Sequence, residues 1–161
     1  MAPPLDTALL RALRTHGHAP ATERAIARFS SLGEHGLLWL AIAGAGAVAG
    51  GDRRPEFKRA GATVAAAYAA NQAIKLIVRR RRPQLPGLGP VVDTHSQLSY
   101  PSAHASTSFA GARALSGLLP AAPLYALAAA LALSRPYLGV HYPSDTVAGA
   151  LLGTAVAELA R

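Results

Sequence analysis

Three short segments of this sequence carry side chains that could together bind and cleave a phosphate ester. They are KLIVRRRRP at 75–83, PSAH at 101–104 and SRPYLGVHYPSD at 134–145. Fixed cations stabilise a phosphoryl group during its transfer, and histidine is the side chain most often used to donate or accept a proton. Each segment is a weak signal by itself. All three in this order, each beside an apolar stretch, indicate phosphoryl chemistry.

The first segment pairs a lysine with an arginine seven positions later. Lys75 and Arg82 are close to two helical turns apart, so both side chains can point along one helix face towards the following loop. Lys75 lies inside a helix, where an ionisable residue in apolar surroundings needs a partner and indicates function. The arginines at 79, 80 and 81 are interpreted differently, as anchors of the helix end among lipid headgroups.

The second and third segments place two histidines beside helix ends. Ser102 is a good N-cap, and His104 falls in the first turn, where free N–H groups suit a phosphate. Arg135 ends another helix, and Asp145 follows His141 by four positions, so the carboxylate can hold one imidazole nitrogen. Two simpler alternatives stay open: an ordinary capped helix with an incidental histidine, and an Asp145 that also caps the last helix.

Together these side chains suggest one site. Lys75, Arg82 and Arg135 would bind the phosphoryl oxygens, and His141 would attack phosphorus to give a phosphohistidine. His104, on the opposite side, would protonate the leaving alkoxide and then activate water. Because the cations neutralise the phosphate, the sequence predicts no metal and no cofactor.

The distribution of charge indicates a membrane protein. The runs 36–51, 60–74, 114–134 and 146–157 contain no Asp, Glu, Lys or Arg, although most are shorter than the ~20 residues that span a bilayer. A soluble Ala-rich bundle is the alternative, but soluble helices rarely lack charge on every face. The net charge of +8 comes from basic residues that flank apolar runs, a pattern that favours lipid headgroups over nucleic acid as the partner.

We predict an all-α fold, an antiparallel transmembrane bundle in one domain, 1–161. Residues 1–32 would form amphipathic helices, 5–16 and 22–32, that lie in the membrane surface, with Arg11 and Arg14 on the polar face of the first. About five spanning helices would follow, with the catalytic bundle at 57–161; their expected ranges are 33–50, 57–79, 102–118, 121–134 and 144–158. Because successive helices would run in opposite directions, the three segments would meet at one end of the bundle.

At these residues the chain resembles the type 2 phosphatidic acid phosphatase superfamily of integral-membrane lipid phosphatases. The family pattern is Lys, six residues, Arg-Pro; then Pro-Ser-Gly-His; then Ser-Arg, five residues, His, three residues, Asp. The sequence departs from it only at Ala103, where the family usually has Gly, and we expect activity to survive this change. The resemblance covers about 60–160. It implies that His141 is the nucleophile, that His104 is the acid–base, and that Ser102 also contacts phosphate.

The substrate implied by the resemblance is a membrane lipid phosphate. Small size and a basic, Ala-rich composition resemble the actinobacterial enzymes that dephosphorylate decaprenylphosphoryl phosphoribose. Undecaprenyl pyrophosphate and phosphatidylglycerophosphate phosphatases share the same motifs. In the loop 83–100 we expect Asp93, His95 and Gln97 to select the headgroup, against the alternative of plain loop polarity. A rival of another class is a non-enzymatic basic adaptor that binds anionic lipid.

The side of the membrane that carries the site follows from a count of basic residues. Outside the catalytic cations, seven arginines would share its face: Arg11, Arg14, Arg24, Arg28, Arg79, Arg80 and Arg81. The opposite face would carry five basic residues: Arg53, Arg54, Lys58, Arg59 and Arg161. Basic residues favour the cytoplasmic side, so the count leans to a cytoplasmic active site in a multi-pass cell-membrane protein, whereas typical family members face outward. The oligomeric state stays open.

Overall fold

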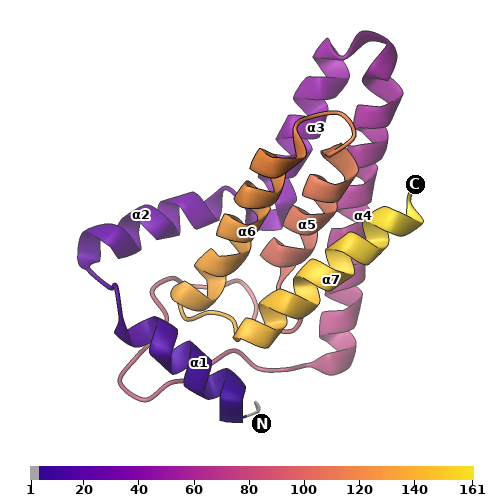
Figure 1. The fold of residues 1–161 in the computed structure, drawn as a ribbon. Coiled ribbons are helices and arrows are strands. Elements are labelled where there is room, and N and C mark those ends of the chain that lie inside the picture. The colour runs from indigo at the N-terminus through magenta and orange to yellow at the C-terminus, as the bar shows by residue number, and fades with distance from the viewer. Residues whose placement is uncertain (1–3) are drawn as a thin grey trace.

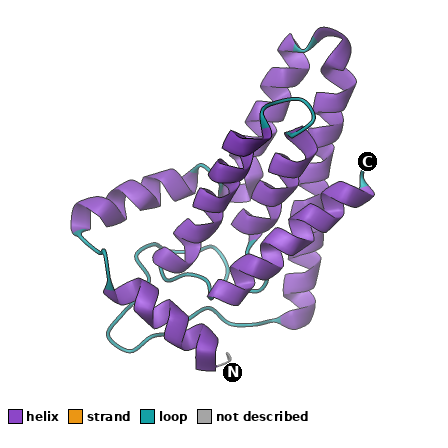
Figure 2. Cartoon of the chain, in the orientation of Figure 1, coloured by secondary structure: helices purple, strands orange, loops and turns teal. Residues whose placement is uncertain are grey.

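A computed structural model describes residues 4–161, in which every regular element is a helix (Figure 1, Figure 2). The chain begins with α1 (Pro4–Thr15) and α2 (Pro20–Ser31), and the short 3-10 turn η1 (Glu34–Gly36) leads into α3 (Leu37–Ala49). A second turn, η2 (Gly51–Arg53), joins α3 to α4 (Arg54–Val78). After a long loop come α5 (Ala103–Leu115), α6 (Ala121–Tyr137) and α7 (Pro143–Leu159). The predicted all-helical class is confirmed.

Helix α5 lies at the centre of the bundle and packs against α4, α6 and α7, while α3 packs on α4 (Figure 1). The apolar core is built around Trp39, Leu115 and Leu131, all inaccessible to solvent. The indole Nε1–H of Trp39 donates to the hydroxyl of Ser108 (3.0 Å), which satisfies the polar atom of this buried ring. Large side chains therefore fill the interior of the bundle.

Two glycines of α7 allow this helix to approach the backbone of α5. A Cβ atom added at Gly153 would lie 2.0 Å from the carbonyl oxygen of Ser106, and one at Gly149 would lie 2.5 Å from that of Ser102. Any larger residue would push the helices apart, as for the small residues that bring membrane helices together. This contact sets the position of the α7 N-terminus, which carries Asp145, against the α5 N-terminus, which carries His104.

The lower end of the bundle in Figure 1 collects the loop 79–102 and four helix ends. These are the C-terminal ends of α4 and α6 and the N-terminal ends of α5 and α7, and α1 crosses below them. Asn71 ties α4 to this end, since its amide donates to the carbonyl of Pro101 (3.1 Å) and the hydroxyl of Ser106 (2.9 Å). The peptide bond between Tyr100 and Pro101 is cis.

The face of α1 that packs against the protein differs from the prediction. Arg14, expected on the polar face towards headgroups, is buried together with Asp6 and Leu10, whereas Leu5 and Leu9 are exposed. The Arg14 guanidinium donates to the carbonyls of Tyr137 (3.0 Å) and Gly89 (2.9 Å). Those carbonyls lie at the end of α6 and in the long loop, where they need a hydrogen-bond donor, and Arg14 provides it. Amphipathic spacing within α1 cannot reveal acceptors that lie so far away in the sequence.

One stretch among residues 4–161 is both long and apolar enough to cross a membrane by length and composition, namely Pro20–Ala49. It is not straight, because His35 and Gly36 adopt left-handed φ values of +50° and +74° at the η1 turn. The turn separates an exposed, polar α2 from an apolar α3. It also brings Glu34 and His35 to the end of the bundle that holds the predicted site residues.

Candidate active site

Five of the residues predicted for catalysis and phosphate binding line one small cavity of about 80 Å³: Lys75, Arg82, His104, Arg135 and His141. They come from α4, the loop after it, α5, α6 and the turn before α7. Lys75 and Arg135 are 5% and 6% exposed, so their charges face the cavity and not the surroundings of the bundle. The prediction that the three segments meet is confirmed.

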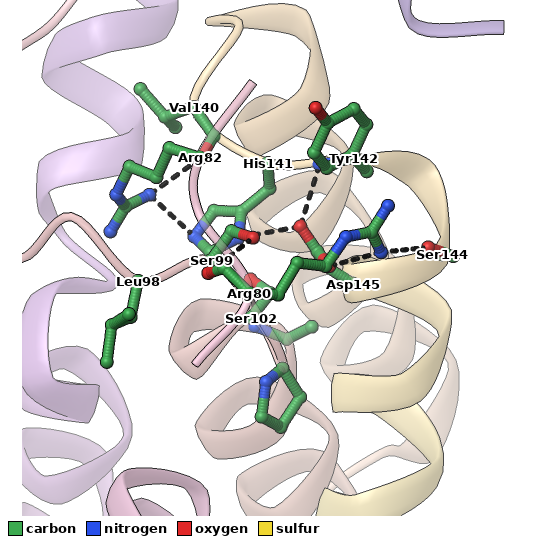
Figure 3. A network of polar contacts seen from close by, with 12 residues as sticks. Arg80, Arg82, Leu98, Ser99, Ser102, Val140, His141, Tyr142, Ser144 and Asp145 are labelled. Carbon is green, nitrogen blue, oxygen red and sulfur yellow. Dashed lines mark hydrogen bonds and ion pairs between the residues drawn. The ribbon is translucent and has the colours of Figure 1, made fainter. Parts of the chain in front are cut away.

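The contacts of His141 define which ring nitrogen is free to react. Arg82 Nη1 lies 3.1 Å from His141 Nε2 and also donates to the carbonyl of Val140 (2.7 Å) (Figure 3). A guanidinium only donates, so Nε2 must carry the lone pair and Nδ1 the hydrogen. Nδ1 is 3.5 Å from Asp145 Oδ2. The cavity therefore receives Nε2 as a nucleophilic atom, with the acid on the opposite edge of the ring.

Asp145 is completely buried and serves the site and the helix together. Its Oδ2 accepts from the backbone N–H of Tyr142 (2.9 Å), the capping contact of α7, and its Oδ1 accepts from Arg80 Nη1 (2.9 Å) (Figure 3). The two roles proposed for this carboxylate, holding His141 and capping α7, are thus compatible. Both depend on the same two oxygens, which are held by a backbone donor and an arginine.

The surroundings of His141 keep its ring neutral. Burial lowers the pKa of His141 well below its usual value, and the charges of Arg82, Arg135 and Lys75 lower it further. A neutral imidazole has the lone pair that an attack on phosphorus requires. The cations that would bind a phosphate thus also maintain the reactive form of the ring.

Arg80 does not lie among headgroups as the sequence suggested. Its Nη2 is 2.6 Å from Asp6 Oδ2 on α1, its Nη1 contacts Asp145, and its guanidinium lies 4.1 Å from the centre of the Tyr142 ring. Arg79 and Arg81 are exposed, in keeping with the original interpretation. Nothing in the run of arginines distinguishes the middle one, because its partners come from α1 and α7.

Asp6 is held by Arg80 and by the N-terminus of α7. Its Oδ1 accepts from the backbone N–H of Ser144 (3.0 Å), and its Oδ2 accepts from the Ser144 hydroxyl (2.5 Å). Burial acts to raise the pKa of Asp6, but the hydrogen bonds from Ser144 and Arg80 outweigh it and leave the pKa below its usual value. Asp6 therefore stays ionised and connects α1 to the carboxylate beside His141.

Ser102 is the N-cap of α5, as the sequence predicted. It is completely buried, its hydroxyl accepts from the N–H of Ala105 as the N-cap of α5 (3.5 Å), and its own N–H donates to the carbonyl of Asp145 (2.9 Å). It is not among the residues that line the cavity, whereas the neighbouring Ala103 is. The residues of PSAH that line the cavity are therefore Ala103 and His104.

The three loop residues expected at the headgroup are divided between two cavities. His95 lines the small cavity with the catalytic candidates. Asp93 and Gln97 line another cavity of about 460 Å³, which also contacts Arg82. The backbone N–H of Arg82 donates to the carbonyl of Gln97 (3.1 Å), so the loop lies beside Arg82 and contributes residues to both cavities.

Several polar residues at the cavity were not predicted. Tyr68 and Gln72 precede Lys75 at helical spacing on α4, a signal that could have found them. Glu34 and His35 come from η1, and with His95 they bring their ligand atoms within 4.8 Å of one another, close enough to hold a metal ion. No spacing rule connects this turn to the loop 83–100.

Ser30, on α2, touches three residues of the second and third segments. Its carbonyl is 3.0 Å from His104 Nε2, and its hydroxyl is 2.8 Å from both Arg135 Nη1 and Ser134 Oγ. The residue is 1% exposed, although α2 is otherwise mostly exposed. No motif marked it, because its partners are more than 70 positions away in the sequence.

Comparison with known proteins connects this arrangement to characterised phosphatases. The chain is 46% identical over 140 residues to a decaprenylphosphoryl-5-phosphoribose phosphatase of Mycobacterium tuberculosis, covering 86% of this chain and 77% of the relative. It is 45% identical over 122 residues to the protein of the same name from Mycolicibacterium smegmatis, covering 74% of this chain and 67% of the relative.

Solved structures share the fold at lower identity. LpxE of Aquifex aeolicus superposes with a TM-score of 0.84 at 23% identity, covering 97% of this chain and 94% of the other. A transmembrane PAP2 type phosphatidylglycerolphosphate phosphatase from Bacillus subtilis superposes with a TM-score of 0.78 at 24% identity, covering 97% of this chain and 82% of the other. The PAP2 superfamily model matches residues 57–161, the range that contains all three segments. By this match and by its identity to the mycobacterial phosphatases, the chain belongs to the PAP2 superfamily.

Proposed function

We propose that this protein is a lipid phosphate phosphatase that releases phosphate from decaprenylphosphoryl-5-phosphoribose. One observation carries the proposal: two histidines and three cations from five separate segments of the chain line a single small cavity. The identity to phosphatases of that name supports the choice of substrate. The adaptor alternative is disfavoured, because Lys75 and Arg135 are buried in the cavity and not displayed to lipid.

The cations would hold the phosphoryl group before reaction. Lys75, Arg82 and Arg135 bind its oxygens, and the buried Nε of Arg135 has no hydrogen-bond partner within residues 4–161, so it has a donor to give. Arg82 Nη1, now beside His141 Nε2, moves to a phosphoryl oxygen when substrate enters. Charge-assisted contacts of this kind act where negative charge spreads in the transition state.

The reaction proceeds in two steps. His141 Nε2 attacks phosphorus, the bond to the ribose oxygen breaks, and His104 gives that oxygen a proton. His104 then takes a proton from water, the resulting hydroxide attacks the phosphohistidine, and inorganic phosphate leaves with His141 restored. Asp145 supports the positive charge that develops on His141, from its position 3.5 Å from Nδ1. All charge neutralisation in this scheme comes from side chains.

The headgroup would be held at the mouth of the cavity. His95, with Glu34 and Tyr68, offers hydrogen-bonding groups next to the phosphate-binding cations. Ribose hydroxyls both donate and accept, and these side chains can complement them. Asp93 and Gln97 belong to the neighbouring cavity, so we assign them a smaller part in headgroup selection.

The protein would sit in the membrane as a multi-pass bundle of α3 to α7. Helices α6 and α7 have 17 residues each, about 26 Å of helix, close to the thickness of the hydrocarbon core. Exposed apolar side chains cover the outside, among them Leu133, Val147 and Leu151. The exposed leucines of α1 would lie in the interface.

The charge count leans to a cytoplasmic active site only weakly. Arg14 and Arg80 make contacts within the protein, which leaves five basic residues on the face of the site, and Arg53 donates to the carbonyl of Gly117 (2.8 Å), which leaves four on the opposite face. A reporter fused after Arg161 decides the orientation. A cytoplasmic C-terminus places the active site on the opposite side of the membrane, and an external C-terminus places it in the cytoplasm.

The activity is tested by phosphate release from lipids in detergent. Purified protein should release phosphate from decaprenylphosphoryl-5-phosphoribose faster than from undecaprenyl pyrophosphate or phosphatidylglycerophosphate. His141→Ala should abolish release, whereas His16→Ala, at an exposed histidine on the turn after α1, should not change it. A His141→Ala protein with wild-type turnover would contradict the mechanism. Faster release from either competing lipid would move the substrate assignment to that lipid.

A further inference from the structure

Ser30 connects the N-terminal segment to the residues proposed for catalysis. It lies outside the 57–161 range that matches the family, yet its carbonyl and hydroxyl contact His104, Ser134 and Arg135 within that range; the carbonyl also accepts from the N–H of Gly33 (3.0 Å). Burial of a hydroxyl and a carbonyl is favourable only if both are hydrogen-bonded, and here each has a partner in the site. The function proposed above uses these partners but gives Ser30 no role.

We propose that Ser30 is a positioning residue that orients both the general acid and a phosphate-binding arginine. The inference rests on the proposed function of His104 and Arg135. The carbonyl of Ser30 holds one edge of the His104 ring, and the hydroxyl holds one nitrogen of the Arg135 guanidinium. One residue of α2 thus sets the geometry of two groups that line the cavity.

The carbonyl contact determines which nitrogen of His104 exchanges the proton. A carbonyl oxygen only accepts, so His104 Nε2, 3.0 Å away, must keep its hydrogen. Nδ1 is then the atom that donates to the leaving oxygen and later takes a proton from water. The Ser30 carbonyl thereby fixes the orientation of the His104 ring, as Asp145 does for His141. Because a carbonyl is neutral and a carboxylate is charged, it stabilises the protonated ring less, and His104 releases its proton more readily.

The hydroxyl contact leaves Arg135 with a donor for phosphate. Arg135 Nη1 donates to Ser30 Oγ (2.8 Å), and Ser134 Oγ, itself 2.7 Å from the carbonyl of Leu131, lies 2.8 Å from the same oxygen. When Ser134 donates to Leu131, Ser30 can donate to Ser134, so each hydroxyl supplies one hydrogen. The guanidinium is fixed at Nη1, while its buried Nε has no partner within residues 4–161.

The hydroxyl is tested with Ser30→Ala, with Ser31→Ala as the matched control. Ser31 is the next residue, is exposed, and donates to the carbonyl of Arg28 on α2. We expect S30A to lower kcat/KM and the affinity for vanadate by about 10–100-fold, the range for loss of one hydrogen bond to a charged group. Ser30→Cys keeps the side-chain volume but is a weak acceptor, so it should resemble S30A and not the wild type.

The carbonyl is tested through Gly33, which packs against the same edge of His104. A Cβ atom at this position would lie 2.8 Å from His104 Cδ2 and 3.5 Å from Nε2, so Gly33→Ala pushes the ring away from the Ser30 carbonyl. We expect a fall in kcat, an alkaline limb of the pH–rate profile at lower pH, and vanadate affinity within about threefold of wild type. Thermal unfolding of each variant checks that the protein is folded.

Three results would overturn the proposal. The first is an S30A protein with the same kcat/KM and vanadate affinity as S31A. The second is an S30C protein that behaves as wild type while S30A is impaired. The third is a G33A protein with an unchanged pH–rate profile. Vanadate binding is measured without turnover. Wild-type protein that binds vanadate but hydrolyses none of the lipids would contradict the proposed function and leave the Ser30 comparison decisive.

Discussion

Replacing Arg80 with glutamine should both destabilise the protein and slow its chemistry. Arg80 contacts Asp6 on α1 (2.6 Å) and Asp145 on α7 (2.9 Å), and glutamine removes both ion pairs. Loss of one partner of a fully buried pair costs about 3–5 kcal/mol, whereas exposed pairs contribute about 0–1 kcal/mol. The Arg80 side chain is 18% exposed and Asp145 is fully buried, so we expect a loss between these limits, about 2–3 kcal/mol in the free energy of unfolding.

Thermal unfolding in detergent measures this loss. At about 2–4 °C per kcal/mol for a chain of this size, R80Q should unfold about 5–10 °C below wild type. We also expect kcat to fall about tenfold, equivalent to 1.4 kcal/mol, because the Arg80 contact at Oδ1 of Asp145 directs Oδ2 towards His141.

Arg79 and Arg81 provide matched controls from the same run of arginines. Both are exposed, so R79Q and R81Q should stay within about 0.5 kcal/mol of wild type. Combining R80Q with Asp6→Asn should cost less than the sum of the two single changes, because the residues are in contact. An R80Q protein that matches R79Q and R81Q in both unfolding temperature and kcat would refute the argument.

Three further predictions concern pH, the headgroup and metals. Because burial and neighbouring cations lower the pKa of His141, the acid limb of kcat/KM in a pH–rate profile should lie below pH 6.5. The same shift affects stability. Below pH 6.5 the unfolded chain binds a proton at His141 that the folded protein does not, so the free energy of unfolding should decrease as the pH falls. In an assay with two substrates, His95→Ala should raise the ratio of the KM for the phosphoribose lipid to the KM for phosphatidic acid several-fold. Asp93→Ala, in the other cavity, should change this ratio less than about twofold. Equal effects of the two substitutions would contradict the assignment of His95 and Asp93 to different cavities. Turnover should be unchanged after treatment with EDTA, and loss of activity that added metal restores would show that the Glu34–His35–His95 group holds a required ion.

The sequence by itself determined the chemistry and the helices. Motif spacing depends on neighbours along one chain segment, so the sequence could associate Lys75 with Arg82 and His141 with Asp145. The helical period assumed for these pairs was wrong, because α4 ends at Val78, before Arg82, and α7 begins at Pro143, after His141. The observed helices α3 to α7 fall within a few residues of the expected ranges, because charge-free runs and Pro or Gly breaks mark them.

Only the tertiary structure decided how the site is supported. Ser30 meets Arg135 across 105 positions, and Asp6 meets Ser144 across 138. No periodicity operates over such distances. Amphipathic spacing placed Arg14 at the membrane surface, and the run of arginines at a helix end placed Arg80 there. Burial reverses that assignment, because a charged or polar group removed from water must find a partner, and the available partners are set by which helix ends meet. The same physical requirement accounts for the contacts of Ser30 with His104 and Arg135, though no residue beside it in the sequence indicates them.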